Sequence, residues 1–272
     1  MDTNKNTYTI IYATVLVVLV AAILAFVASS LKSKQQKNID IEKQMSLLNS
    51  VGLAKESASA SDKDTYIENE FSKYITGSLT VNYKGESSNI VESTSNDMGA
   101  VVKSPAFKID LKGQYDIMKQ IANSSTDKKS ALEEKLILPV FICTLENGEK
   151  LYIFSCYGAG LWGPIWGYIA LKSDFNTIYG ASFGHKSETP GLGAEIASEK
   201  FQKQFIDKEI FTDGAFSSIK IVKGGATPGN LHEVDAVSGG TITSQSLDAT
   251  IKSWIGYYLP YIKACKENLN IK

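Results

Sequence analysis

A short segment near the C-terminus combines two adjacent glycines with several hydroxyl side chains. Residues 235–244 read DAVSGGTITS, and a helix with one apolar stripe is expected to follow them. Free backbone N–H groups and the positive end of the helix dipole favour an anion at such an N-terminus. A plain helix cap by Thr243 or Ser244 is the alternative, although a cap needs one hydroxyl only. The excess of hydroxyls favours a ligand, and the glycines and hydroxyls available to it are Ser238, Gly239, Gly240, Thr241 and Thr243.

A second glycine-containing segment could approach the same ligand. Residues 184–193 read GHKSETPGLG and leave a predicted strand through Pro190-Gly191, a pair suited to a type II turn. Glycines let backbone N–H groups approach a ligand closely, although a tight surface loop is the simpler interpretation. His185 has no paired nucleophile, so no acid–base role is assigned to it.

A third segment, GAGLWG at residues 158–163, matches the glycine spacing of a dinucleotide-binding loop. Its surroundings contradict that interpretation. Pro164 and Gly167 make a poor helix start, and Phe183 and Gly184 stand where an acidic residue is required. The better explanation is a glycine-rich loop in which Leu161 and Trp162 pack as an apolar wall, and such a wall could border a ligand.

Composition limits how any anion can be held. The 272 residues carry a formal net charge of −1, and all 28 basic residues are lysine. Without arginine there is no bidentate guanidinium for phosphate, which leaves N–H groups, hydroxyls, lysines or a covalent bond. The near-neutral charge also argues against nucleic-acid binding.

The N-terminal region predicts a membrane anchor. The stretch from Ile10 to Ala28 carries no charged residue, and nineteen helical residues span about 28 Å, close to the hydrocarbon thickness of a bilayer. A cleaved signal peptide is the alternative, but the apolar stretch is long for one and lacks a good cleavage site. Lys32, Lys34 and Lys37 follow the stretch, which weakly favours a cytoplasmic body.

The rest of the chain predicts an α+β fold with a largely antiparallel sheet, because strand-like segments cluster instead of alternating with helices. We expect an N-terminal tail at residues 1–9, a transmembrane helix at 10–31, a stalk helix with a polar linker at 32–64, and a globular domain at 65–272. Asn147-Gly148 lies between two apolar segments and predicts a hairpin with a two-residue type I′ turn, in which Glu146 opposes Glu149. Pro260 is expected to kink or end the last helix.

These motifs together resemble the NqrC family, the flavin-bearing components of the sodium-translocating NADH:quinone reductases. The likeness runs from the anchor to the last helix and rests on GLWG at residues 160–163, HKSETPGLG at 185–193 and the Asp-x-x-Ser-Gly-Gly-Thr pattern from Asp235 to Thr241. The last pattern resembles a flavinylation motif, and Gly240 stands where alanine is usual. The resemblance implies FMN joined through its phosphate to the Thr241 hydroxyl by a flavin transferase. Further implied or candidate contacts are Glu188, Thr189, Gly191, Leu192, Gly193, Leu161 and Trp162.

The implied activity is electron relay toward ubiquinone within a multi-subunit, sodium-pumping complex, without a catalytic residue or metal in this chain. The resemblance also implies a single-pass protein of the inner membrane, in contact with lipid, with a periplasmic flavin domain. Three alternatives stay open: the flavin-carrying component of a ferredoxin-oxidising ion pump, an anchored periplasmic binding module without covalent flavin, and a hydrolase that uses Ser238 or Thr241. The hydrolase lacks an evident base, since only His232 lies nearby in the sequence.

Overall fold

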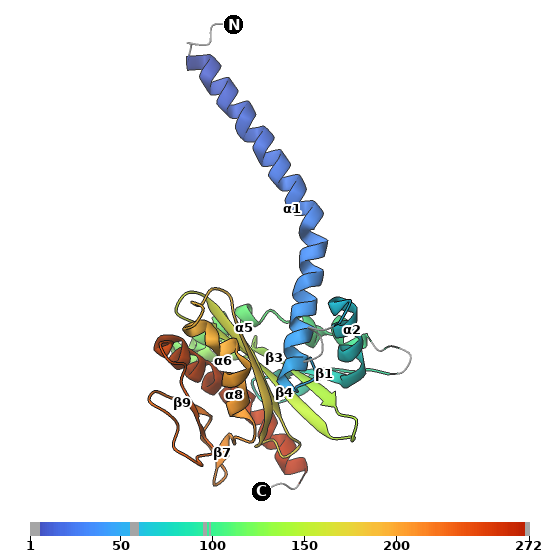
Figure 1. The fold of residues 1–272 in the computed structure, drawn as a ribbon, viewed down its shortest axis with the longest axis vertical. Helices are drawn as coiled ribbons and strands as arrows, with labels where there is room; N and C mark the ends of the chain where they lie inside the picture. Colours follow the sequence, from blue (N-terminus) through green and yellow to red (C-terminus); the bar gives the residue numbers. More distant parts are fainter. Residues whose placement is uncertain (1–5, 55–59, 95–96, 98, 270–272) are drawn as a thin grey trace. The chain divides into compact units, whose positions relative to one another are not determined.

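The computed structural model describes residues 6–54, 60–94, 97 and 99–269. Its helices and strands follow the order α1 (Asn6–Ser50), α2 (Lys63–Tyr74), β1 (Ile75–Asn82), β2 (Ser87–Glu92), α3 (Ala100–Lys103), α4 (Pro105–Lys108), α5 (Leu111–Ala122), α6 (Thr126–Glu133), β3 (Ile137–Thr144), β4 (Lys150–Ala159), β5 (Pro164–Leu171), β6 (Ile178–His185), η2 (Gly193–Ala197), α7 (Glu199–Gln202), η3 (Lys203–Phe205), β7 (Phe211–Thr212), β8 (Ala215–Phe216), β9 (Lys220–Val222), β10 (Glu233–Asp235) and α8 (Thr241–Asn268) (Figure 1).

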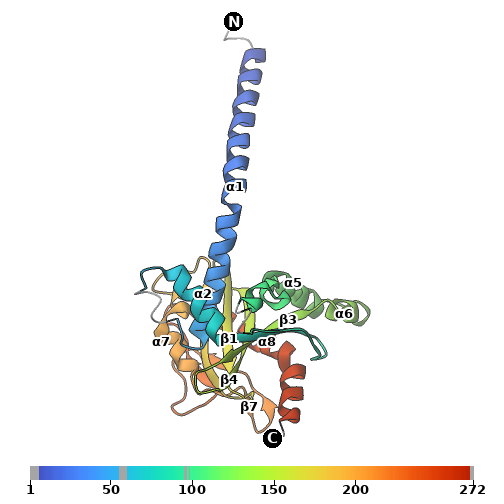
Figure 2. The ribbon, with the colours of Figure 1, turned by 90° about the vertical axis from the view of Figure 1, so that its right-hand side faces the viewer.

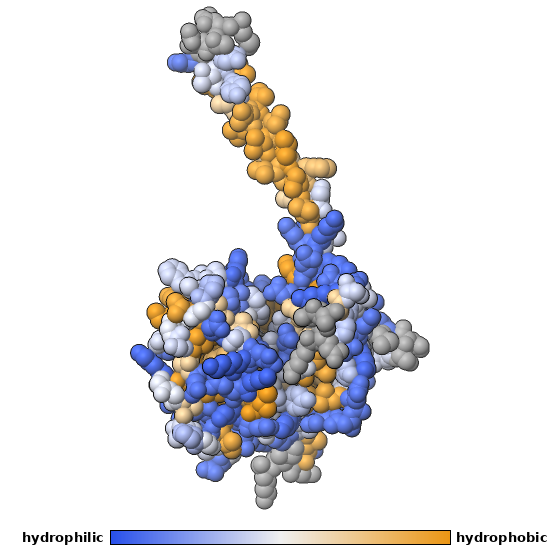
Figure 3. All heavy atoms as spheres, viewed as in Figure 1, coloured by the Kyte–Doolittle hydropathy of each residue, from blue (hydrophilic) through white to orange (hydrophobic). Residues whose placement is uncertain are grey.

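The chain divides into two compact units, Met1–Lys43 and Gln44–Lys272. The first unit contains the exposed apolar part of α1, which is long and apolar enough to cross a membrane and is drawn in orange in Figure 3. The expected anchor and stalk form one continuous helix, because residues 32–37 contain no glycine or proline that would interrupt it.

The second unit begins earlier than the domain boundary expected at residue 65. Leu47, Leu48 and Val51 at the end of α1 are buried in it, so these residues belong to the folded body. Gly52 ends α1 with a φ of +74°, and the Leu53 N–H donates to the Leu48 carbonyl at 2.9 Å. This is a glycine C-cap. Of the expected polar linker, residues 55–59 lie outside the described residues, and α2 begins at Lys63.

A six-stranded antiparallel sheet in the order β2-β1-β3-β4-β5-β6 forms the centre of the second unit. This confirms the α+β class with a largely antiparallel sheet. Short pairs β7-β8 and β9-β10 lie outside the main sheet, and β9 and β10 run parallel to each other. The turned view in Figure 2 shows α7 and the α5–α6 pair on opposite sides of the body.

Helix α8 packs on one face of the sheet through the predicted apolar stripe. Trp254 and Tyr258 are fully buried there, and each also donates to a strand backbone. The Trp254 indole N–H binds the Tyr157 carbonyl at 2.7 Å, and the Tyr258 hydroxyl binds the Pro139 carbonyl at 2.7 Å. These two hydrogen bonds fix α8 along the sheet, which matters because its first residue is Thr241.

The opposite face of the sheet is covered by the end of α1, α2 and α4. Phe71 of α2, Phe107 of α4 and Phe141 of β3 form a chain of edge-to-face ring contacts at 5.9 and 6.4 Å. Burying both faces explains why β3 and β4 are apolar on both sides instead of alternating with polar residues.

The hairpin between β3 and β4 differs from the prediction by one position. Cys143 pairs with Leu151, and the Leu145 N–H donates to the Glu149 carbonyl. The Gly148 N–H donates to the Leu145 carbonyl, and Gly148 has a φ of +82° whereas Asn147 has no positive φ. A type I′ turn needs positive φ at both central residues, so the expectation was wrong. The loop is a three-residue turn with glycine in the left-handed position.

Pro260 lies inside α8 and does not end it, because the helix continues to Asn268. A proline ring collides with the carbonyl four residues earlier, which here belongs to Gly256. Tyr258, Tyr261 and Ile262 are buried around the proline. Their packing holds the second half of the helix on the body despite the missing hydrogen bond.

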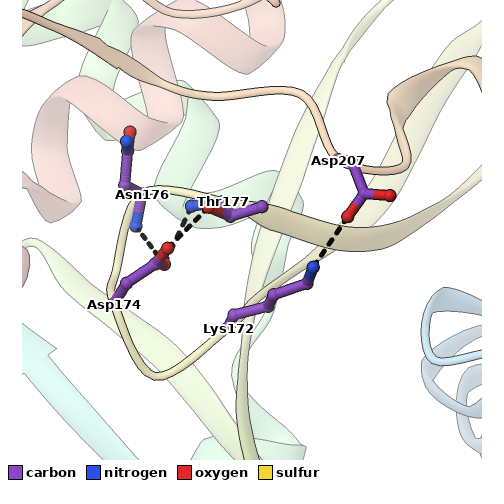
Figure 4. A network of polar contacts seen from close by, with 5 residues as sticks. All are labelled: Lys172, Asp174, Asn176, Thr177 and Asp207. Atoms are coloured by element: carbon purple, nitrogen blue, oxygen red, sulfur yellow. Dashed lines mark hydrogen bonds and ion pairs between the residues drawn. The ribbon is translucent and has the colours of Figure 1, made fainter.

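The turn between β5 and β6 is held by a polar network (Figure 4). The Asp174 carboxylate accepts hydrogen bonds from the N–H groups of Asn176 and Thr177 at 2.9 Å and from the Thr177 hydroxyl at 2.5 Å. Lys172 forms a 2.7 Å ion pair with Asp207. Burial alone would raise the pKa of Asp174, but these three hydrogen bonds outweigh it and lower the pKa below 3.8.

Candidate functional site

Three segments far apart in the sequence meet around one cavity of about 220 Å³ at the N-terminus of α8. They are the β4–β5 turn, the loop between β6 and η2, and the first residues of α8 with the loop before it. The residues that line the cavity are Leu161, Trp162, Glu188, Thr189, Leu192, Gly193, Gly239, Gly240, Thr241, Ile242 and Thr243.

Strand β5 brings the first two segments together, since it pairs with β4 on one side and β6 on the other. Ile165 lies opposite His185, so both loops leave the same end of the sheet. The Gly160 N–H closes the β4–β5 turn on the Gly163 carbonyl at 2.7 Å. The Ser187 hydroxyl then donates to the Trp162 carbonyl at 2.8 Å, which fixes one loop on the other.

The N-terminus of α8 lacks a side-chain cap. Gly240 occupies the cap position, and its N–H donates to the Val237 carbonyl at 3.0 Å. Gly239 before it has a φ of +73°, which favours glycine. The alternative of a cap by Thr243 or Ser244 is not observed, because the Thr243 hydroxyl donates to Glu188 and the Ser244 hydroxyl accepts from the Val237 N–H at 3.1 Å. The first N–H groups of the helix are therefore open to an anion.

Thr241 is the first residue of α8 and is half-buried at the cavity. Its hydroxyl forms no hydrogen bond with any described residue. The neighbouring residue Thr243 is 1% exposed, and its hydroxyl donates to Glu188, so it is already engaged. Of the two threonines, Thr241 is therefore the one whose hydroxyl no described residue engages.

Glu188 is 4% exposed and joins all three segments. Its Oε1 accepts from the Trp162 N–H at 2.8 Å, and its Oε2 accepts from the Thr243 hydroxyl at 2.5 Å. Its own N–H donates to Nδ1 of His185 at 3.2 Å. A carboxylate can stay buried only when donors surround it, and here they come from the β4–β5 turn and from α8.

Two glycines make room for this carboxylate. A Cβ at Gly160 would lie 2.5 Å from Glu188 Oε1, and one at Gly193 would lie 2.6 Å from Oε2 and would also collide with the Thr243 hydroxyl. Gly240 is similarly close to Gly193, because a Cβ there would lie 3.2 Å from the Gly193 Cα. The glycine at position 240 thus lets the two loops approach within backbone contact.

The two histidines have structural roles in this arrangement. His185 accepts from the Glu188 N–H, so it supports the loop that carries the buried carboxylate. His232 lies away from the cavity lining, where its Nε2 contacts the Thr212 hydroxyl at 2.9 Å and its Nδ1 contacts the Glu209 carbonyl at 2.7 Å.

Most of the residues expected from the sequence lie at the cavity, with two differences. Ser238 is exposed and Gly191 stands at the turn with a φ of +75°, and neither lines the cavity. Ile242 lines it although sequence reasoning missed it. Its signal was an apolar residue that does not belong to the buried stripe of α8, and it is 53% exposed.

Comparison with known proteins identifies the family. Residues 160–256, which contain all three loops, match the family model of the FMN-binding domain. The chain is 32% identical to NqrC of Vibrio anguillarum, the C component of its Na(+)-translocating NADH-quinone reductase, over 94% of this chain and 91% of that protein. The chain belongs to the NqrC family. It is also 30% identical to the corresponding protein of Haemophilus ducreyi over 97% of this chain and 95% of that protein.

Solved structures of NqrC proteins agree with the fold. The crystal structure of the Parabacteroides distasonis protein superposes with a TM-score of 0.63 at 34% identity, over 85% of this chain and 96% of that one. NqrC from Shewanella oneidensis superposes with a TM-score of 0.61 at 25% identity, over 84% of this chain and 98% of that one. Over the matched part, this chain therefore has the fold of these NqrC proteins.

Proposed function

We propose that this NqrC homologue carries FMN as a phosphoester of Thr241 and relays electrons in a sodium-pumping NADH:quinone oxidoreductase. The observation that carries the proposal is the Thr241 hydroxyl, which lies without a hydrogen-bond partner among the described residues at the uncapped N-terminus of α8. The same position lies inside the match to the FMN-binding domain. Open N–H groups and the helix dipole would balance the charge of the phosphodiester.

The dimensions of the site fit a flavin phosphate bound at its base and a ring bound outside. A volume of about 220 Å³ is below the range of about 300–1,000 Å³ typical of pockets that enclose whole ligands. The rim is apolar and exposed, with exposed fractions of 46% at Leu161, 66% at Trp162, 43% at Leu192 and 53% at Ile242. These side chains would hold the isoalloxazine ring.

An exposed ring suits exchange of electrons with another protein better than conversion of a small substrate. Bound FMN would supply the one-electron chemistry, as flavins do in electron transfer. The residues of this chain would hold and orient it: Thr241 by the ester, the glycines by close backbone approach, and the rim by apolar contact. No acid–base residue of this chain is needed for such a relay.

The cellular setting belongs to the same proposal. Helix α1 would anchor the chain by a single pass in the lipid of the inner membrane, with the flavin domain on the periplasmic side. The other subunits of the quinone reductase would deliver and accept electrons on the way to ubiquinone. A flavin transferase would attach FMN to Thr241 during maturation.

Intact mass tests the ester. The full chain, purified in detergent after expression with a flavin transferase, should carry one FMN unit, and its band should fluoresce on a denaturing gel. Thr241→Val should remove both signals, whereas Ser246→Ala, which removes another hydroxyl of α8 outside the cavity, should retain them. An FMN-sized mass on the Thr241→Val chain would refute the assignment. Flavin that washes out on denaturation would favour a non-covalent binding module.

A further inference from the structure

The N-terminus of α8 already has an anionic group beside it before any flavin is attached. Glu188 is buried, lines the cavity, and accepts the hydroxyl proton of Thr243 from the first turn of the helix. Both of its carboxylate oxygens are engaged by donors from this chain. The positive end of the helix dipole is therefore partly balanced by a residue of the protein.

The lining of the cavity supplies no compensating cation among the described residues. Glu188 alone is charged there, and none of these lining residues is a lysine. The chain has no arginine to reach in from elsewhere. A free flavin phosphate, which carries up to two negative charges, would enter a small and partly enclosed site whose one charged neighbour repels it.

We infer that Glu188 is a specificity-determining residue that suppresses reversible binding of phosphate compounds at the flavin site, so that the flavin is held by its ester and not by affinity. The inference rests on the proposed attachment at Thr241. A phosphodiester carries one charge fewer than the free phosphate, and its covalent bond does not depend on the balance of attraction and repulsion. Glu188 can therefore tolerate the attached flavin while it disfavours free nucleotides and phosphate.

The structure separates this charge effect from the role of Glu188 in joining the loops. Glu188→Gln keeps the length of the side chain, and its amide oxygen can still accept from the Trp162 N–H. Its amide nitrogen can donate to the Thr243 hydroxyl, which reverses that hydrogen bond without removing it. The variant thus removes the charge and retains the connections.

The test uses the full Thr241→Val chain, expressed without a flavin transferase and purified in detergent. FMN and riboflavin are each titrated with this protein, and binding is followed by flavin fluorescence. Riboflavin has the same ring and no phosphate. With Glu188 in place, we expect FMN to bind less than about threefold more tightly than riboflavin, since repulsion offsets the helix dipole. Adding Glu188→Gln should tighten FMN binding by about tenfold or more and leave riboflavin binding unchanged.

The control is Glu195→Gln on the same Thr241→Val background. Glu195 is an exposed carboxylate of η2 outside the cavity lining, so this variant makes the same change in net charge and should not alter the affinity for FMN. A larger preference for FMN while Glu188 is present, a smaller gain after Glu188→Gln, or an equal gain after Glu195→Gln would overturn the inference.

The outcome of the titrations can be assigned even if one variant or the proposed function fails. If Glu188→Gln does not fold, the affinities of the Thr241→Val chain for FMN and riboflavin still test the inference, because a preference for FMN above about threefold would contradict it. Failure of the proposed function has a different signature, because the matured wild-type chain would then lack the FMN mass whatever the titrations show.

Discussion

The Thr243 hydroxyl donates a 2.5 Å hydrogen bond to the Glu188 carboxylate, although 55 positions separate the two residues in the sequence. This contact joins the first turn of α8 to the loop after β6, and Glu188 extends the connection to the β4–β5 turn through the Trp162 N–H. The three glycine-containing loops thus form one arrangement around a buried carboxylate, which motivates the first two predictions.

Removing the donor should destabilise the domain. Thr243→Val keeps the shape of the side chain but leaves Glu188 Oε2 without its hydrogen bond in a buried position. We expect the free energy of unfolding to fall by about 1.5–3 kcal/mol, as for other buried hydrogen bonds to charged groups. Thr250→Val is the matched control, because the Thr250 hydroxyl donates to the Ser246 carbonyl of its own helix and to no other described residue. Equal denaturation midpoints for the two variants in detergent would contradict this role of Thr243.

Filling the space beside the carboxylate should have a related effect. The Cβ introduced by Gly193→Ala would overlap Glu188 Oε2 and Thr243, so the loop must shift at a cost of about 1–3 kcal/mol. Gly256→Ala places a methyl group in open space within α8 and should instead stabilise by about 0.5–1 kcal/mol. Thermal unfolding followed by circular dichroism compares the two. A Gly193→Ala chain as stable as the wild type would show that the loops are not closely packed there.

The position of α8 should depend on the Tyr258 hydroxyl. Tyr258→Phe leaves the buried Pro139 carbonyl without a donor, so we expect a loss of about 1–3 kcal/mol in the free energy of unfolding. Tyr257→Phe removes a hydroxyl from the neighbouring, partly buried ring and should cost less than about 0.5 kcal/mol. Chemical denaturation of both variants provides the measurement, and the prediction fails if Tyr257→Phe is the more damaging change.

Acid should weaken the turn between β5 and β6. The lowered pKa of Asp174 means that its ionised form stabilises the native state above the ordinary value of 3.8 and that this contribution is lost as the pH falls through the lower native pKa. Asp174→Asn should therefore cost about 1–2 kcal/mol at pH 7 and progressively less below pH 3.8. Unfolding measured across this pH range checks the sign, and a cost that grows on acidification would contradict it.

Local patterns in the sequence predicted much of the fold. The uncharged stretch predicted the apolar helix, and the spacing of Leu247, Ile251 and Trp254 predicted the buried face of α8. Strand β2 was not predicted, because its sequence, SSNIVE, is largely polar and the strand is an exposed edge of the sheet. Helix α2 was missed too, since only a few of its residues are apolar and their burial depends on the neighbouring sheet.

The residue types alone did not determine the geometry of the turn between β3 and β4. Asn147-Gly148 favoured a two-residue turn, yet a three-residue turn with the same glycine is also compatible with that pair and shifts the register by one. Pro260 was expected to kink or end the last helix, and it does not end α8, in which Tyr261 and Ile262 after the proline are buried.

The sequence by itself determined the family motifs, the apolar helix, the absence of arginine and the presence of hydroxyls and glycines in three loops. Only the tertiary structure decided which hydroxyl is available, because Thr243 and Ser244 form hydrogen bonds with distant or preceding segments and Thr241 forms none with the described part of the chain. It also placed the carboxylate of Glu188 inside the site. Hydrogen bonds between loops depend on how β5 and α8 pack, and the order of residues along the chain does not contain that information.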